Sequence, residues 1–512
     1  MSTGEQTHWA DTIADQAVQK GGRHLVSTGI TPSGDIHIGN MREILTGDAT
    51  FRALSERGVQ CSFNYIADNS DPLRRVYPFL DKEAFEPHVG KPLCDIPCPC
   101  GDHPSYAEHF LSPFIEALDR LGVQVEVVRA DEAYRRGEFD DVVITALTHQ
   151  SEIKEILRQE TGKEVADDWS PFNVICTDCG RMTETTVTGF DPDAKTVSYT
   201  CRCGASGTAP IAGHGKLTWR VDWPARWKVF GVTIEPFGKD HASRGGSYDT
   251  GGRIATEVYG IDPPLPIPYE WISLRGKGDM SSSKGNVVTI SEVLDVVPAE
   301  VLRYFVFRSS PMKSLGFEPG LPLLNLFDEY AAAAVKGDNR AVELSQIGAE
   351  RLLGIPYRHI VSLIQTTAGN IDRIAEILQR NGVEVSDKEG LQQLVAYASR
   401  WLETFAPEEV KFQILDSLPE RASELSAEQK RGLALLAERL QHGMNADQIH
   451  NLIYEIKEEL GIAPGAVFKA IYVSLLGKDR GPRAGWFLSS LDTDFLKTRF
   501  EEASAADSAA SP

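Results

Sequence analysis

The stretch HLVSTGITPSGDIHIGN at residues 24–40 decides the fold. Its first part, HLVSTG (24–29), is a short apolar run that ends in glycine, which is typical of a buried strand. The loop TPSGD follows, and residues 38–58 then have the pattern of a helix. CSFNYIAD (61–68) has the pattern of the next strand. Strand, loop, helix and strand in this order form one βαβ unit, which predicts a parallel sheet.

Strand patterns recur further along the chain, at VQVEVVRA (123–130), GVTIEPFG (231–238) and PYEWISL (268–274). Helices are expected at 107–122 and within 241–260. Between about 94 and 216, cysteines, prolines and glycines break the periodic pattern. The sequence therefore predicts an α/β fold, a Rossmann-type parallel sheet split by an insertion.

Beyond about residue 335 the chain has a helical pattern. Apolar residues recur at three- and four-residue steps within 391–405 and 449–460, and Asn445 and Gln448 have capping-box spacing before the second run. We expect the small, polar tail, 501–512, to be disordered. The expected division is 1–93 and 217–276 for the two halves of the α/β domain, 94–216 for the insertion, 277–335 for a loop and stem-contact region, 336–500 for an all-α domain and 501–512 for the tail.

Composition narrows the classes of protein. A chain of 512 residues is too long for one core, and it contains no run of 18 apolar residues that would span a membrane. The first residues lack the basic and apolar regions of a signal peptide, so we expect a cytoplasmic protein. A net charge of −21 argues against broad, non-specific nucleic-acid binding, although a local basic patch could still meet such a partner.

The loop after the first strand is a candidate phosphate site. Ligands bind beyond the carboxyl ends of parallel strands, and a helix N-terminus there offers N–H groups to phosphate. His37 and Asn40 lie three residues apart at the expected helix start, and both can donate hydrogen bonds to a polyphosphate. The alternative interpretation is a helix cap with an incidental histidine.

A second short stretch, GDMSSSKGN (278–286), has no residue suited to a core except one methionine. Its alternative interpretation is a plain surface loop. Its hydroxyls, backbone N–H groups and the Lys284 ammonium could instead close over a pyrophosphate and neutralise the charge that develops as it leaves.

Together the two stretches resemble the HIGH and KMSKS signatures of class I aminoacyl-tRNA synthetases, with HIGN at 37–40 and MSSSK at 280–284. The resemblance extends to YIADNSDPLRR and to the segment from WRVDWPARW to GKDHAS, and it is to class I lysyl-tRNA synthetase. It covers about residues 20–320, while the helical remainder is similar in character and length. The resemblance implies that the all-α domain, 336–500, binds the anticodon of the tRNA.

The resemblance implies catalytic roles and contacts to ATP, with two departures from the signatures. Asn40 stands where HIGH ends in histidine; Asp279 and Ser282 stand at the lysines of KMSKS, and Lys284 comes one residue late. The implied catalytic residues are His37, Asn40, Ser282, Ser283 and Lys284. The implied ATP-binding residues are Pro32, Ser33, Gly34, Asp35, Ile36, His37, Ile38, Gly39, Asn40, Asp279, Met280, Ser281, Ser282 and Ser283.

A pocket for lysine needs an acceptor or carboxylate for the ammonium and an apolar or aromatic wall along the stem. The resemblance implies that Gly29 and Thr31 lie beside the substrate backbone and that Trp219 and His241 line the pocket. Asp68 and Asp222 are both candidates to pair with the ammonium, and the sequence does not decide between them. The alternative role of Trp219 is core packing.

The cysteines indicate metal. Cys176 and Cys179 form C-x-x-C, and Cys201 and Cys203 form C-x-C, which predicts a closed four-thiolate structural zinc site. The surrounding insertion has little apolar periodicity, so we expect zinc to supply its folding energy.

The second cluster, within 94–110, has a less regular spacing. Cys98, Cys100, His103 and His109 could form a Cys2His2 site, with Asp102 or Asp95 as the alternative to one of these ligands and Cys94 spare. The alternative interpretation is free thiols with histidines that cap the following helix. The sequence therefore predicts one or two structural zinc ions per chain.

The resemblance implies an enzyme that uses ATP with Mg²⁺ to activate L-lysine as lysyl-adenylate and then transfers the lysyl group to the 3′ end of tRNA(Lys). The oligomeric state is left open. Three alternatives remain at this point: a synthetase for glutamate, glutamine or arginine; a small-molecule nucleotidyltransferase; and a zinc-dependent nucleic-acid-binding module without catalysis. The long helical region argues against the second alternative, and the paired phosphate motifs argue against the third.

Overall fold

The structure, a computed structural model, describes residues 7–274, 288–348, 355–385 and 387–506. The chain forms two compact units. The first comprises Met1–Leu294, Leu302–Phe317 and Arg340–Ile347, and the second comprises Asp295–Val301, Glu318–Asn339 and Gly348–Pro512.

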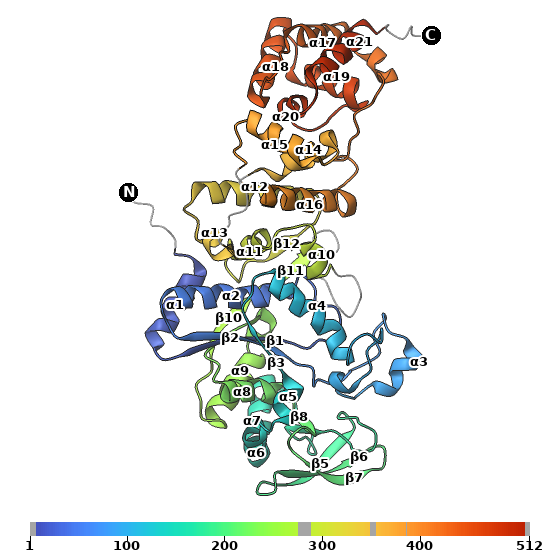
Figure 1. The fold of residues 1–512 in the computed structure, drawn as a ribbon. Helices are drawn as coiled ribbons and strands as arrows, with labels where there is room; N and C mark the ends of the chain where they lie inside the picture. Colours follow the sequence, from blue (N-terminus) through green and yellow to red (C-terminus); the bar gives the residue numbers. More distant parts are fainter. Residues whose placement is uncertain (1–6, 275–287, 349–354, 386, 507–512) are drawn as a thin grey trace. The chain divides into compact units, whose positions relative to one another are not determined.

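The first unit is an α/β domain (Figure 1). Its helices are α1 (Trp9–Lys20), α2 (Met41–Glu56), α3 (Lys82–Phe85), α4 (Tyr106–Arg120), α5 (Ala130–Arg135), α6 (Asp140–Thr148), α7 (Gln150–Thr161), α8 (Trp219–Phe230), α9 (Ser247–Glu257), α10 (Ile290–Leu294) and α13 (Arg340–Ser345), with most of α11 (Ala299–Phe307). Its strands are β1 (His24–Ile30), β2 (Cys61–Ala67), β3 (Glu126–Arg129), β4 (Phe172–Val174), β5 (Thr185–Asp191), β6 (Thr196–Cys201), β7 (Ser206–Pro210), β8 (Gly215–Leu217), β9 (Ile234–Gly238), β10 (Leu265–Tyr269), β11 (Ile272–Leu274) and β12 (Leu315–Phe317).

The central sheet has five strands in the order β10-β9-β1-β2-β3, and every pairing in it is parallel. The strands at its centre are buried, as parallel strands covered on both faces must be. Helices α1 and α2 lie on one face, and α8 and α9 lie on the other (Figure 1). The predicted Rossmann-type parallel sheet is confirmed.

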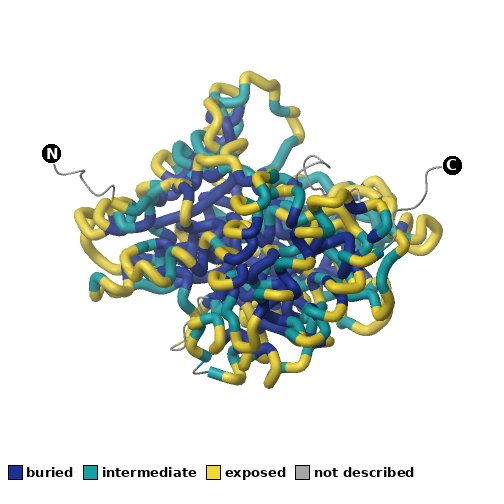
Figure 2. The backbone as a smooth tube through the Cα atoms, turned by 90° about the horizontal axis from the view of Figure 1, so that it is seen from above, coloured by how far each residue is buried: buried dark blue, intermediate teal, exposed yellow. Residues whose placement is uncertain are grey.

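Helix α2 is enclosed by its neighbours. Eleven of its residues are buried, because it packs against the sheet on one side and against α1 and α11 residues on the other. Figure 2 shows the buried segments in dark blue behind exposed loops in yellow. The helix begins at Met41, three residues later than the sequence indicates, so His37 precedes it and Asn40 occupies its N-cap position.

Two further details of the α/β domain differ from the prediction. PYEWISL (268–274) forms two strands, not one: β10 joins the central sheet, whereas β11 pairs with β12 in a separate two-stranded sheet. Strand β3 belongs to the central sheet although it lies inside the predicted insertion, so 94–216 is not one continuous insertion.

Strands β4 to β8, which lie outside the central sheet, form two small antiparallel sheets. Strands β4 and β8 pair antiparallel, and β5, β6 and β7 form an antiparallel three-stranded sheet. Val197, Tyr199 and Ala209 of that sheet are buried in one cluster with residues of α6, α7 and α8. The expectation that this region cannot bury an apolar core is therefore wrong, because its strands pack on helices that the periodicity within the segment did not reveal.

The second unit is helical, as predicted. Its helices are α12 (Leu321–Lys336), α14 (Tyr357–Thr367), α15 (Ile371–Arg380), α16 (Lys388–Thr404), α17 (Ala427–Arg439), α18 (Ala446–Leu460), α19 (Pro464–Leu476), α20 (Ala484–Ser489) and α21 (Thr493–Ala505). Asn445 and Gln448 form the predicted capping box of α18. Helix α21 continues to Ala505, so residues 501–505 are helical and not a disordered tail; residues 507–512 lie outside the described residues.

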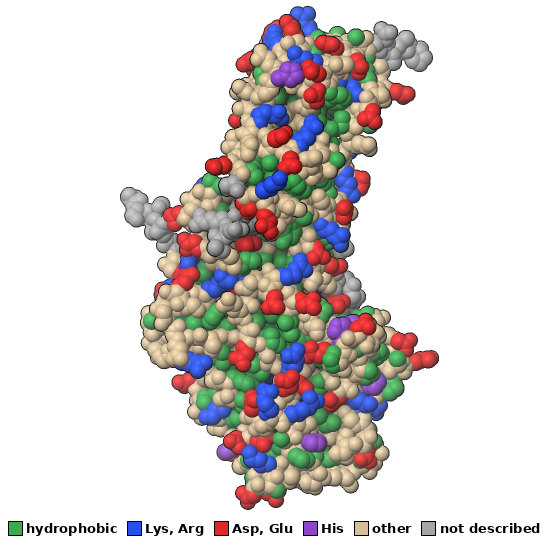
Figure 3. Space-filling model, in the orientation of Figure 1, with side chains coloured by type: hydrophobic (Ala, Val, Ile, Leu, Met, Phe, Trp, Pro, Cys, Tyr) green, Lys and Arg blue, Asp and Glu red, His purple; other side chains and the backbone are tan. Residues whose placement is uncertain are grey.

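Within the described ranges, no single helix is long and apolar enough to cross a membrane. The pair α18 and α19, bent by 119°, meets that criterion only when the two helices are taken together. On the face drawn in Figure 3, Lys and Arg side chains are interspersed with Asp and Glu side chains.

Candidate active site

Most of the sequence-predicted substrate residues lie where strands of the central sheet end. Gly29 is the second-last residue of β1, and Thr31 directly follows that strand. Asp68 directly follows β2, and His241 lies in a short 3-10 helix (Lys239–Ala242) directly after β9. Trp219 is the first residue of α8. The carboxyl edge of a parallel sheet is the usual ligand site of this fold, so the topology gathers these residues from distant parts of the sequence.

The loop that contains HIGN is a tight turn. Asn40 Oδ1 accepts a hydrogen bond from His37 N at 3.2 Å, and the N–H groups of Met41 and Arg42 donate to Ile38 O and Gly39 O at 3.2 and 3.3 Å. The first N–H groups of α2 are therefore used by the turn itself. A Cβ atom on Gly39 would lie 2.6 Å from His37 Cε1, so only glycine fits beside the imidazole.

The His37 ring is held as a neutral hydrogen-bond donor. Its Nδ1 accepts from Gly39 N at 3.0 Å, which leaves the proton of the neutral ring on Nε2. Burial lowers the pKa of His37 to about 4, so the ring is uncharged near pH 7. The side chains of His37 and Asn40 thus remain as the donors that the sequence predicts for phosphate, in place of the helix N–H groups. Pro32, Ser33, Gly34, Asp35 and Ile36 form the loop between β1 and His37.

The same loop is tied to the residues that follow the MSSSK stretch. Ile38 N donates to Val288 O at 3.1 Å, and His37 forms a β-bridge with Thr289. Asp279, Met280, Ser281, Ser282, Ser283 and Lys284 lie outside the described residues. The described end of that segment nevertheless lies beside the HIGN turn.

Glu43, in the first turn of α2, was not predicted. Its carboxylate accepts from Gly29 N at 2.9 Å and from Tyr269 Oη at 2.7 Å. Burial of its carboxyl group raises the pKa of Glu43 to about 7, although the residue as a whole is only partly buried. It forms no ion pair within the described part of the chain. A Cβ atom on Gly29 would lie 2.8 Å from Ile66 O, which explains why glycine stands next to this carboxylate.

Aromatic rings form a wall near the same edge. The rings of Trp219 and His241 are 5.9 Å apart, and Trp223 stacks on Trp219 at 5.3 Å. Behind them, the Glu235 carboxylate accepts from the indole N–H groups of Trp223 and Trp227. Burial raises the pKa of Glu235 to about 8 despite these donors. Trp219 is 36% exposed, so it is not a core residue.

Asp68 and Asp222 belong to a sealed ionic cluster. Lys216 Nζ lies 2.8 Å from Asp68 Oδ1 and 3.5 Å from Asp222 Oδ2, and Arg226 pairs with both carboxylates. Asp71 also pairs with Lys216 and accepts from Thr31 Oγ1 at 2.9 Å. The cluster thus connects the residue after β1 to β8 and α8.

Asp68 and Lys216 of this cluster are both held in their charged forms. Burial alone would raise the pKa of Asp68, but Arg226 and Lys216 outweigh it and hold the pKa at about 2. Burial would lower the pKa of Lys216, but Asp222, Asp68 and Asp71 raise it above its usual range. The carboxylates of Asp68 and Asp222 are therefore already neutralised by the protein's own cations.

The structure brings Cys176, Cys179, Cys201 and Cys203 together, with all four sulfur atoms within 4.8 Å of one another. Two of the sulfur pairs, Cys176–Cys203 and Cys179–Cys201, are 3.7 Å apart. A tetrahedron with Zn–S bonds of about 2.3 Å has edges of about 3.8 Å, so this group fits zinc.

The second group consists of Cys98, Cys100, His103 and His109, as the first of the sequence alternatives proposed. Cys98 Sγ lies 3.5 Å from the Nδ1 atoms of both histidines, which fits the edge of about 3.5 Å expected for one sulfur and one nitrogen ligand of zinc. Asp95 is bound instead by Arg135, at 3.3 Å.

Comparison with known proteins agrees with this geometry. The family described as tRNA synthetases class I (K) matches residues 7–347. The chain belongs to this family. The resemblance to class I lysyl-tRNA synthetase is therefore confirmed.

Curated relatives of the family cover almost the whole chain. The lysine–tRNA ligase 1 of Methanosarcina acetivorans is 50% identical over 525 residues, which cover 97% of this chain and 98% of that protein. The lysine–tRNA ligase of Archaeoglobus fulgidus is 45% identical over 499 residues, 97% of this chain and 100% of that protein. A solved glutamate–tRNA ligase from Elizabethkingia meningosepticum is similar at 14% identity and a TM-score of 0.42, covering 94% of this chain and 99% of that one, too weakly to support any conclusion.

Proposed function

We propose that the protein is a lysine–tRNA ligase, which activates L-lysine with ATP and transfers the lysyl group to the 3′ end of tRNA(Lys). The observation that carries this proposal is identity of up to 50% with lysine–tRNA ligases over 97% of the chain, within one family of class I synthetases. The described site agrees with it, because a carboxylate without a cation partner in the described ranges and an aromatic wall lie at the carboxyl edge of a Rossmann-type sheet.

Glu43 receives the ammonium of the substrate lysine in this proposal. Glu43 has no cation beside it in the described ranges, and Gly29 N and Tyr269 Oη fix its orientation. Asp68, like Asp222, is occupied by Lys216 and Arg226. We therefore assign the ammonium to Glu43 in place of both aspartates, and we keep Gly29, Thr31, Trp219 and His241 as substrate-binding residues.

The activation step needs positioning and charge stabilisation more than covalent catalysis. The lysine carboxylate attacks the α-phosphorus of ATP, a mixed anhydride forms, and pyrophosphate leaves with the bond electrons. The neutral His37 donates from Nε2 and Asn40 donates from its amide to the phosphate oxygens. Ser282, Ser283 and Lys284 are assigned to the leaving pyrophosphate. Mg²⁺ bound with ATP would supply further neutralisation of charge.

The two cysteine-containing groups are structural metal sites in this proposal. Each provides four ligands and no open position, so neither can carry the reaction. One or two zinc ions per chain would hold the turns around Cys98–His109 and Cys176–Cys203. Because Val197, Tyr199 and Ala209 already bury an apolar core, zinc adds to the stability of the second region and does not supply all of it.

The partners are ATP, lysine and tRNA(Lys), and the helical unit that includes most of 336–500 is assigned to the anticodon end of the tRNA. Cytoplasmic location, predicted from the sequence, stays a prediction.

The test is ATP–pyrophosphate exchange with each common amino acid in turn, with and without total tRNA from the same organism. Lysine should be the amino acid that supports fast exchange. Fast exchange with glutamate or arginine instead would refute the lysine assignment while leaving the family intact.

Metal content is tested separately by elemental analysis of purified protein. We expect between one and two zinc ions per chain, and Cys179→Ser should remove one and make residues 172–217 more sensitive to protease. Cys61→Ser is the matched control, because Cys61 lies in β2, away from both groups. A metal-free preparation with unchanged protease sensitivity would contradict both sites.

A further inference from the structure

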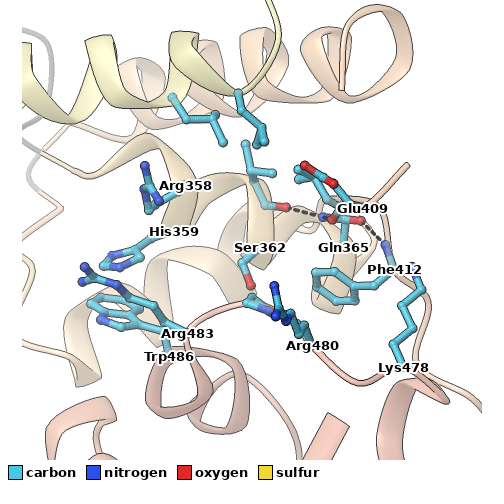
Figure 4. Close-up of a pocket in the computed structure, with 16 residues that line it drawn as sticks. Arg358, His359, Ser362, Gln365, Glu409, Phe412, Lys478, Arg480, Arg483 and Trp486 are labelled. Atoms are coloured by element: carbon cyan, nitrogen blue, oxygen red, sulfur yellow. Dashed lines mark hydrogen bonds between the residues drawn. The ribbon is translucent and has the colours of Figure 1, made fainter. Parts of the chain in front are cut away.

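The helical unit contains a cavity of about 280 Å³, lined by residues of α12, α14 and α20 that include His359 and Trp486 (Figure 4). It lies in the unit already assigned to the anticodon end of the tRNA and falls under that assignment. The α/β domain contains a side chain that the proposed function leaves without a role, the carboxylate of Asp71.

Asp71 lies near the carboxyl edge of the central sheet, four residues after the end of β2. Its backbone is fixed, because its carbonyl oxygen accepts from Leu93 N at 2.9 Å. Its two carboxylate oxygens have different partners. Oδ1 pairs with Lys216, and Oδ2 accepts from Thr31 Oγ1 at 2.9 Å. Asp71 therefore connects a buried ionic cluster with a residue of the substrate site.

The bond to Asp71 fixes the direction in which the Thr31 hydroxyl can act. A hydroxyl has one proton to donate and two lone pairs, whereas a carboxylate only accepts. The bond to Asp71 therefore uses the single proton of Thr31. Thr31 Oγ1 can still accept a hydrogen bond but has no proton left to donate. A ligand group that hydrogen-bonds this oxygen must be a donor, which excludes a carboxylate and an unprotonated phosphate oxygen.

The cluster that includes Asp71 has one carboxylate more than it has cations. In the part of the chain that the structure describes, its three aspartates and two cations form ion pairs only with one another; they are Asp68, Asp71, Asp222, Lys216 and Arg226. The side chain of Asp71 is the most exposed of the three carboxylates, at 12% against 2% for Asp68 and 0% for Asp222. Because an unbalanced buried charge is costly, this outer carboxylate suits a ligand that brings a cation.

Lys216 holds Asp71 in place. It lies in β8, is 2% exposed, and is in register with Asn173 of β4. Tyr134 fixes the next residue of the strand, because its Oη accepts from Leu217 N at 3.2 Å. Asp71 cannot rotate away from Thr31 without also leaving this buried ammonium, so the direction of the Thr31 hydroxyl is set by the fold.

The spacing along β1 matches the length of a lysine side chain. Gly29 N is bound to Glu43, which receives the ε-ammonium in the proposed function. Thr31 lies two residues further toward the carboxyl edge, about 6–7 Å away at the rise of a strand. The five bonds from the α-carbon of lysine to its ε-nitrogen span about 6 Å when extended. A lysine held by Glu43 can therefore place its α-carbon near Thr31, directly before the loop 32–40 that is assigned to ATP.

We infer that Asp71 is a positioning residue that makes Thr31 the acceptor for the α-ammonium of the amino-acid substrate. Asp71 engages the hydroxyl proton of Thr31, and the surplus negative charge of the cluster balances the α-ammonium. The inference rests on the proposed function, because it requires an α-amino acid held by Glu43. It adds the group of the substrate that Thr31 binds and the residue that sets the direction of that hydrogen bond.

Two lysine analogues that differ only in the α-ammonium test this inference. L-Lysinamide has the α-ammonium and 6-aminohexanamide lacks it, and neither has the carboxylate that reacts with ATP. Their inhibition constants are measured in lysine-dependent ATP–pyrophosphate exchange with the full chain. The wild-type chain should bind lysinamide about tenfold or more tightly, which is the scale of one hydrogen bond to a charged group.

Asp71→Asn should abolish this preference. The single amide oxygen of the asparagine faces Lys216, and its NH2 group then donates to Thr31 Oγ1, so the hydroxyl becomes a donor. The inhibition constant of lysinamide should rise about tenfold or more, while that of 6-aminohexanamide stays at its wild-type value. Thr31→Val should have the same selective effect, and Thr31→Ser, which keeps the hydroxyl, should retain the preference.

A matched control separates this effect from a change in the fold. Asp140 of α6 is 8% exposed, as Asp71 is, and its carboxylate pairs with Lys195 at 3.4 Å. Asp140→Asn should leave both inhibition constants unchanged. Asp71→Asn should keep a Tm near the wild-type value, because it leaves two carboxylates against two cations.

If lysine-dependent exchange is normal but both inhibition constants rise equally in Asp71→Asn, Asp71 supports the whole site and the inference is wrong. It is also wrong if Asp71→Asn and Thr31→Val leave the inhibition constant of lysinamide unchanged, since another group then binds the α-ammonium. Absence of lysine-dependent exchange in the wild-type chain would overturn the proposed function, and this inference with it.

Discussion

Two groups of carboxylates lie near the carboxyl edge of the same sheet and differ in how their charge is balanced. Asp68, Asp71 and Asp222 are paired with Lys216 and Arg226 inside the protein. The carboxylates of Glu43 and Glu235 accept only uncharged donors in the described structure, a backbone N–H, a phenol and two indoles. A protein can hold such an unbalanced carboxylate in its interior when a ligand brings the cation.

The pKa directions express the same contrast. Arg226 and Lys216 overcome burial and hold the pKa of Asp68 at about 2, whereas burial raises that of Glu43 to about 7 and that of Glu235 to about 8. The first group therefore stabilises the fold, and the second is available for binding or for orienting what binds. Each prediction below tests one of these two groups of carboxylates.

The largest effect is expected for Lys216→Met. Removing one cation leaves Asp68, Asp71 and Asp222 with Arg226 alone, and breaking a buried ion pair in this way typically costs about 3–5 kcal/mol. Chemical denaturation should show a free energy of unfolding lower by that amount. Lys163→Met, at an exposed lysine, is the control and should change nothing measurable. A loss below about 1 kcal/mol would mean that the cluster behaves like a surface ion pair.

The second prediction concerns Glu43→Gln. The amide oxygen can still accept from Gly29 N, and its NH2 group can donate to Tyr269 Oη in place of the bond that the carboxylate accepts. The substitution removes the charge that would meet the lysine ammonium, so kcat/KM for lysine should fall about 10²-fold or more. The KM for ATP should stay near its wild-type value. Glu56→Gln, at the other end of α2 and on the surface, is the matched control. If kcat/KM for lysine were unchanged in Glu43→Gln, an acceptor other than Glu43 would bind the lysine ammonium.

The sequence was sufficient for features that local spacing encodes. The two cysteine pairs, the strand–loop–helix order around HIGN and the capping box at Asn445 all follow from residues a few positions apart, and the structure contains each arrangement. PYEWISL was misinterpreted because its second half pairs with β12, about forty residues away, and that partner is not visible in the stretch itself.

Glu43 was missed for a related reason. A glutamate on a helix with an apolar face is normally solvated, and only a second covering layer makes α2 buried almost all round. That layer includes residues 306–313, whose carbonyl groups accept from Arg42. Likewise, Lys216 lies 148 residues from Asp68, so the sequence could not show that this aspartate was already neutralised.

A smaller effect is expected in the pH dependence of kcat/KM for lysine. With a pKa of about 7, the Glu43 carboxylate goes from mostly protonated at pH 6 to mostly ionised at pH 8, so kcat/KM should rise about tenfold over this range. Burial lowers the pKa of His37 to about 4, so this ring should add no titration step there, and burial also lowers the pKa of His241 from its usual value. Steady-state rates at fixed ionic strength test this. A profile that is flat in the wild type, or equally steep in Glu43→Gln, would contradict the assignment.

The smallest effect is expected for Glu235→Gln. The glutamine has a single acceptor oxygen, so one of the indole N–H groups of Trp223 and Trp227 loses its partner. Such a hydrogen bond contributes about 0.5–1.5 kcal/mol, and Trp223 passes part of that loss to Trp219 and His241, which it contacts. The KM for lysine should therefore rise about threefold with kcat unchanged. Trp227→Phe removes the donor farther from the wall and should change KM less. If Glu235→Gln instead lowered kcat/KM as much as Glu43→Gln does, the ammonium would belong to Glu235 and not to Glu43.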